Sequence, residues 1–203
     1  MKKVAVIVPL FALSCLGAGA ALAAGSAEKG ESKATACIAC HGAQGNSANP
    51  EWPVLAGQHE QYIHKQLQAF KNGARKNPLM TPMAMSLSDD DMADLGAYFS
   101  AQKPAGLEAD PSKLALGQRI FRSGDPKSGI PACASCHGPN GSGNPAAMYP
   151  LIRAQYATYV GAQLRNYRAG TRQTDQNKMM RDVASTMSDE QIDAVASYVQ
   201  GLR

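Results

Sequence analysis

The stretch Cys37-Ile-Ala-Cys40-His41 returns as Cys133-Ala-Ser-Cys136-His137, and these two C-x-x-C-H motifs decide how the 203-residue chain is interpreted. Two thiols three positions apart on a helical turn can bond the two vinyl groups of one haem. The histidine that follows is then placed beneath the iron as an axial ligand. The sequence therefore predicts two covalently attached haem c groups, with His41 and His137 as proximal ligands.

Other chemistries of paired cysteines fit the two motifs less well. A disulfide or a thioredoxin-like site in each C-x-x-C leaves the histidine after both pairs unexplained, and no βαβ pattern surrounds them. A structural zinc site made from two C-x-x-C pairs usually joins pairs that are closer in sequence.

The N-terminus has the pattern of a secretory signal peptide: Lys2-Lys3, an apolar run over 4–16, and the small-residue ending Ala21-Leu-Ala23. We expect cleavage after Ala23, so that residues 1–23 are removed. A membrane anchor is disfavoured because the apolar core is short and rich in Gly and Ala. Lipid attachment at Cys15 is the other alternative, and the residues before it make a poor lipobox. Export predicts a periplasmic location.

Much of the chain repeats once the motifs are superimposed. Residues 53–73 match 150–170, and residues 88–95 match 188–195, in a unit of about a hundred residues that is too long for a solenoid repeat. We predict an all-α protein of two tandem domains, 24–102 and 112–203, joined by a linker at 103–111.

The coarse pattern is helical in both halves. Tyr62, Ile63, Gln66 and their neighbours recur at helical spacing, as do their counterparts in the second half. Ser88 and Ser188 are predicted N-caps of the last helix of each domain. Long loops rich in Gly, Asn and Pro separate the helices, so each small domain has little apolar core without its haem.

The repeat also selects candidates for the sixth iron ligand among the eight methionines after residue 23. Counting back eight residues from each serine cap gives Met80 and Met180, which pair as methionines in ligand-bearing loops. Their neighbours Met83 and Met179 remain alternatives, and plain core packing is the other explanation for methionine-rich segments. Histidine–methionine ligation fills both axial positions, which suits electron transfer more than catalysis.

With these residues in place, the chain resembles the dihaem cytochromes c4, whose domains have the class I cytochrome c fold. The resemblance implies that Pro53 and Pro150 offer carbonyls that fix the proximal histidines. It implies a periplasmic carrier of single electrons, not an enzyme, whose redox partners are donors on the side of quinol–cytochrome c reductase and acceptors such as haem–copper terminal oxidases or periplasmic reductases. It also allows peripheral membrane association.

Two other functions compete with the carrier. A dihaem electron-transfer subunit of an enzyme complex, such as a flavocytochrome c sulfide dehydrogenase, would have a similar sequence. A dihaem peroxidase needs an open iron, which the paired methionines disfavour.

The two halves differ in one packing motif. The second domain has the family's Gly-x-x-x-aromatic pattern in Gly117 to Phe121, whereas the first has Gly30 to Ala34. We expect the first domain to be the less rigidly packed.

Charge is distributed unevenly along the chain. The net charge is +4, but residues 24–104 carry seven basic and eight acidic residues, and residues 105–203 carry eleven basic and eight acidic. This distribution predicts a dipole that could orient the protein on a charged partner. Basic clusters with interleaved aromatics are missing from the sequence, so a nucleic acid is not an expected partner.

Overall fold

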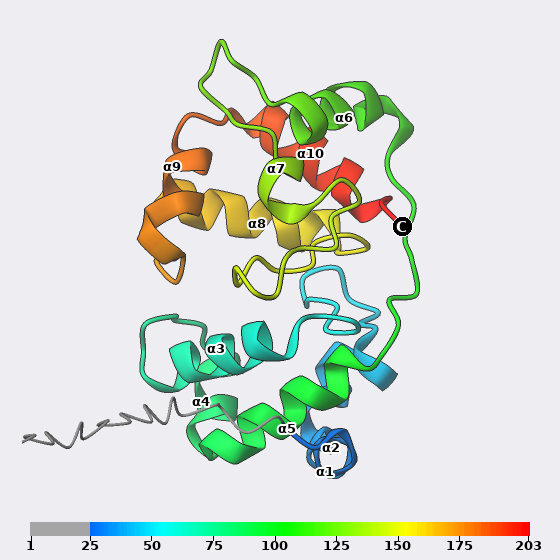
Figure 1. Ribbon diagram of the computed structural model, residues 1–203, viewed down its shortest axis with the longest axis vertical. Helices are drawn as coiled ribbons and strands as arrows, with labels where there is room; N and C mark the ends of the chain where they lie inside the picture. The colour runs from blue at the N-terminus through cyan, green and yellow to red at the C-terminus, as the bar shows by residue number, and fades with distance from the viewer. Residues whose placement is uncertain (1–24) are drawn as a thin grey trace, which may run out of the picture.

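The computed structural model describes residues 25–203, and the predicted signal peptide and Cys15 lie outside the described residues. Figure 1 shows two helical halves stacked along the long axis and joined by one extended segment. Within residues 25–203 all regular elements are helices, as predicted, and two isolated β-bridges are the only β pairings. None of the described helices combines the length and apolar character needed to cross a bilayer.

The order of helices repeats between the halves. The first half consists of α1 (Ala27–Lys33), α2 (Thr35–His41), η1 (Ala43–Gly45), α3 (Glu60–Lys71), α4 (Met80–Met85) and α5 (Asp89–Ser100). The second consists of η2 (Pro111–Lys113), α6 (Leu114–Ser123), α7 (Ala134–His137), α8 (Ala157–Arg168), η3 (Gln176–Lys178), α9 (Met179–Ser185) and α10 (Asp189–Gln200). In each half the last helix packs against the first and against the long middle helix.

Both predicted N-caps are confirmed. Ser88 Oγ accepts the Asp91 N–H at 3.1 Å, and the Asp91 carboxylate accepts the Ser88 N–H at 2.9 Å. Ser188 and Gln191 form the same capping box at the start of α10. Each box satisfies amide groups that the first turn of a helix leaves free, and so fixes where the last helix begins.

A glycine allows the first and last helices of each half to cross closely. A Cβ on Gly117 would lie 2.2 Å from the carbonyl oxygen of Ala194, and one on Gly30 would lie 2.0 Å from that of Asp94. Neither position can hold a larger side chain unless the helices move apart. The α1–α5 and α6–α10 crossings therefore depend on these two residues.

The core of the second half is larger. Phe121 is fully buried, and its ring centroid lies 5.4 Å from that of Tyr198 on α10. In the first half Ala34 occupies the matching position, and Tyr98 and Phe99 of α5 make an edge-to-face pair at 5.0 Å. The first half therefore buries less apolar side-chain area at its helix crossing.

The methionine segments are short helices, whereas the sequence predicted loops. Met80 is the first residue of α4, and Met180 is the second residue of α9. Asn77 Oδ1 accepts the N–H of Met80 at 2.9 Å, and an Asp175 carboxylate oxygen accepts the N–H of Arg181 at 3.0 Å. These side chains accept amide groups of the first turns and so stabilise the starts of both helices.

Candidate haem centres

The two motifs sit at corresponding places. Cys37, Cys40 and His41 lie on α2, whereas Cys133 is the residue before α7, which ends at His137. Within residues 25–203 no disulfide joins the four motif cysteines. In each motif the first cysteine is partly buried and the second is exposed. Burial raises the pKa of the Cys133 thiol to about 11 and also raises that of Cys37.

The motif histidines are buried and oriented by proline carbonyls. His41 Nδ1 lies 2.9 Å from the Pro53 oxygen, and His137 Nδ1 lies 3.0 Å from the Pro150 oxygen. An Nδ1–H that donates to a carbonyl leaves Nε2 with a free lone pair. Burial lowers the pKa of both histidines, more than the hydrogen bond raises it. Both imidazoles are therefore neutral at pH 7 and suited to bind iron through Nε2.

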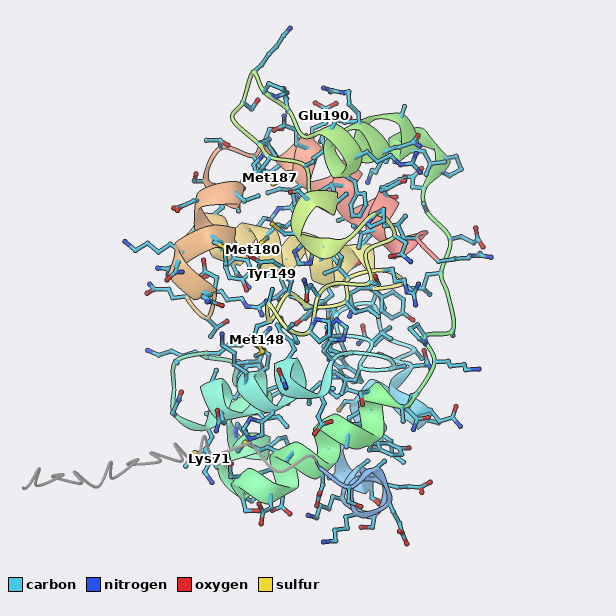
Figure 2. All side chains as sticks on the ribbon, in the orientation of Figure 1. Lys71, Met148, Tyr149, Met180, Met187 and Glu190 are labelled. Atoms are coloured by element: carbon cyan, nitrogen blue, oxygen red, sulfur yellow. The ribbon has the colours of Figure 1, made fainter. Side chains whose placement is uncertain are left out.

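One cavity of about 470 Å³ joins the two motifs and receives side chains from both halves. Both motif histidines line it, and so do all four candidate methionines, Met80, Met83, Met179 and Met180. In Figure 2 Met180 and Tyr149 lie in the interior of the second half, and Met148 lies near the boundary between the halves. The cavity is mainly apolar, and each half contributes one motif histidine and at least one methionine to its lining. Such a lining fits two haem c groups.

The methionine candidates differ in their surroundings. Met180 is half-buried and packs against the core of the second half, whereas the Met179 sulfur lies 3.7 Å from the Tyr149 hydroxyl. In the first half Met80 is half-buried, but Met83 is 43% exposed. All four candidates line the cavity, and Met179 and Met180 are equally half-buried, so exposure sets only Met83 apart.

Within the described residues the two cysteine motifs do not come together as a set of ligands for one metal ion. Within residues 25–203 no group of three or more His, Cys, Asp or Glu side chains could hold one. The zinc alternative therefore has no support in the described part of the chain.

Two glutamines form hydrogen bonds between the halves that the sequence did not predict. Gln155 exchanges two hydrogen bonds with the backbone of Val54, both at 2.9 Å. Gln58 does the same with Leu151, at 2.8 and 3.0 Å. The signal was present, because Gly-Gln-x-x-x-Tyr begins at Gly57 and its glutamine, Gln58, recurs as Gln155 at the matching position. Nothing in one sequence shows that each glutamine reaches the other domain.

Comparisons with known proteins agree with this geometry. The family model described as Cytochrome c matches residues 27–103 and again 114–203. Cytochrome c4 of Azotobacter vinelandii is 46% identical over 194 residues, which cover 91% of this chain and 92% of the relative. The crystal structure of reduced recombinant cytochrome c4 from Pseudomonas stutzeri is similar with a TM-score of 0.86 at 45% identity, covering 89% of this chain and 100% of that one.

Another relative has a more specific name. The thiosulfate dehydrogenase electron acceptor of Stutzerimonas stutzeri (strain A1501) is 40% identical, over 81% of this chain and 78% of that protein. The two matches to the cytochrome c family, the two motifs and the likeness to cytochromes c4 over nine-tenths of the chain agree on two haem c groups and on electron transfer without an enzymatic activity. The chain belongs to the cytochrome c4 family.

Proposed function

We propose that this protein carries single electrons in the periplasm. Its donors would lie on the side of quinol–cytochrome c reductase, and its acceptors would be haem–copper terminal oxidases or periplasmic reductases. In this proposal residues 1–23 direct export and are removed, and the domains span 24–102 and 112–203. The membership in an electron-transfer family and the signal-peptide pattern support these assignments.

The observation that carries the proposal is the pair of matched ligand sets around one cavity. His41 and His137 are neutral, buried and held by proline carbonyls, and Met80 and Met180, which the repeat pairs, line the same cavity. We propose that these four residues are the axial ligands. Haem c supplies a one-electron ferric–ferrous couple when bound, and its potential is raised by a methionine ligand.

The chain's own contribution is to keep the ligands in place and water away. The hydrogen bond from each histidine to a proline carbonyl fixes the ring and its tautomer. Met80 and Met180 would each supply a thioether to the iron, which would leave oxygen or peroxide no site to bind. Both features suit transfer of an electron without a bound substrate.

Optical spectra of four variants of the holoprotein test the ligands. We expect Met180→Ala and Met80→Ala each to remove about half of the near-infrared sulfur-to-iron band, because each breaks one of two sites. Their matched controls, Met179→Ala and Met83→Ala, should leave the band intact. Loss of the band in Met179→Ala but not in Met180→Ala would transfer the second ligand to Met179. A high-spin iron in the unmutated protein would contradict the carrier.

A second role has one specific observation in its favour, the Stutzerimonas relative that is named as an electron acceptor of thiosulfate dehydrogenase. Here the protein would be the dihaem subunit bound to a periplasmic dehydrogenase. Stable co-purification with such an enzyme from native periplasm would favour this role. Recovery as a free protein that restores electron flow to washed oxidase-containing membranes would favour the mobile carrier.

A further inference from the structure

His59 and Tyr156 occupy equivalent positions in the repeat, and each directly follows a glutamine that reaches the other half. His59 is the residue before α3, and Tyr156 is the residue before α8. Their backbone N–H groups donate to the side-chain oxygens of the preceding glutamines, at 3.0 and 3.1 Å. The two side chains therefore start from matching places at the boundary between the halves.

The two side chains meet the opposite half in different ways. The Tyr156 hydroxyl donates to the Ser47 carbonyl oxygen of the first half at 2.6 Å. The His59 ring lies beside the backbone of Ser142 in the second half. Within residues 25–203 its Nε2 is the one buried side-chain nitrogen or oxygen that has no hydrogen-bond partner. The repeat thus places a satisfied tyrosine on one side of the boundary and an imidazole with an unpartnered nitrogen on the other.

Neighbouring charges do not compensate for the enclosure of the His59 ring. Groups that are charged or titrate near neutral pH belong to the segments around it, namely Glu60, His64 and Lys65 of α3, Lys103 after α5, Arg153 after the Ser142 loop, and Arg203. Glu60 accepts the Gly25 N–H at 2.8 Å. His64 pairs with Asp89 of its own half at 3.0 Å. In the described part of the chain the pKa of His59 has no contribution from a nearby charge.

The enclosed ring favours its neutral form. Burial lowers the pKa of His59, more than hydrogen bonding to the Ser142 backbone raises it. A ring exposed by separation of the halves would have the ordinary pKa of about 6.5. Protonation in the docked state would leave an Nε2–H without an acceptor and a charge without a partner. The contribution of His59 to docking is therefore fully present above that ordinary pKa and is lost as the pH falls through it.

We propose that His59 is a pH-sensitive element of the boundary between the halves, and that its protonation loosens their contact. Histidine is the side chain whose charge changes in the mildly acidic range. The adjacent Gln58 holds the reciprocal contact to Leu151, and the cavity that joins both haem motifs receives side chains from both halves. Acid would therefore act on the contact that places the two motifs relative to each other.

Amide hydrogen exchange of the reduced holoprotein measures this contact. The Val54 N–H donates to Gln155 of the opposite half, and so exchanges when the halves separate. The Leu151 N–H donates to Gln58 and reports the same event. After correction for the intrinsic pH dependence of exchange, both protection factors should fall between about pH 8 and pH 5, by up to about tenfold per pH unit, the limit for one proton. Amides within α10 serve as the reference for unfolding of the second half.

Two variants and one direct titration assign the effect to His59. In His59→Gln the side chain stays polar but gains no charge in acid, so the fall in protection should disappear. The matched control His64→Gln removes a histidine from the same helix whose partner Asp89 belongs to the first half, and it should keep the fall. Nuclear magnetic resonance of the reduced, ¹⁵N-histidine-labelled holoprotein should give His59 a pKa below about 6.5.

Three results would each overturn the proposal. Equal protection of the two amides across the pH range would mean that protonation does not reach the contact. A fall that persists unchanged in His59→Gln would assign the effect to another group. A His59 pKa at or above about 6.5, which needs no variant, would mean that the docked halves do not exclude the charge. None of these readouts depends on the redox partners or on the sixth ligand of either iron.

Discussion

Gln58 and Gln155, which we call the glutamine clasp, offer the sharpest test of how the domains are held together. In Gln155→Met a side chain of similar length replaces the amide, so the buried space stays filled. Val54 is buried, with 8% of its surface exposed. In the variant its N–H and its carbonyl each lose a hydrogen bond of 2.9 Å. Leaving a buried donor or acceptor unpaired costs about 1–3 kcal/mol, so the variant should lose roughly 2–6 kcal/mol of docking energy.

Scanning calorimetry of the holoprotein measures this loss. We expect the melting transition of the unmutated protein to separate into two steps in Gln155→Met, because each half then unfolds with less support from the other. The mirrored variant Gln58→Met removes the equivalent bonds to Leu151 and should cost a similar amount. Gln118→Met, on the exposed face of α6, is the control for the change in residue type.

The reasoning is refuted if Gln155→Met costs no more than the control, within about 0.5 kcal/mol. A single unchanged transition would mean that the reciprocal hydrogen bonds contribute no net docking energy. A loss confined to the second half alone would also contradict a clasp that joins both domains.

Three further predictions concern the helices. Gly117→Ala should destabilise the second half by at least 1–3 kcal/mol in denaturant unfolding, because a Cβ there overlaps the backbone of α10; an unchanged midpoint would contradict the close crossing. Ser188→Ala should cost about 0.5–2 kcal/mol, and Ser188→Thr should recover part of it. Lys33 lowers the pKa of the Asp91 and Asp94 carboxyls through its hydrogen bonds. Their stabilising contribution is present above the ordinary pKa near 3.9 and is lost as the pH falls below it. As the pH is lowered through this range, the free energy of unfolding should therefore fall less steeply in Lys33→Gln than in the unmutated protein. An equal pH dependence in the two proteins would argue against this ion pair.

Local patterns were sufficient to predict the haem motifs, the caps and the helical class. The C-x-x-C-H spacing is fixed by covalent chemistry within five residues, and a serine cap depends only on the three residues that follow it. The two-domain repeat was visible for the same reason, since both halves repeat these short signals at matching intervals. Loops at the methionines were predicted wrongly, because the local pattern did not show that the Asn77 and Asp175 side chains accept backbone N–H groups in the first turns of α4 and α9.

What the sequence by itself determined is therefore local: where each haem attaches, which histidine lies beneath it, and where the last helices start. Only the tertiary structure decided what happens between the halves. Gln58, Gln155, Arg75 and Arg172 each find partners about a hundred positions away in the chain, on the opposite domain. Such pairings depend on how two folded surfaces dock. Their energy comes from burying polar groups together, which no local spacing in the sequence records.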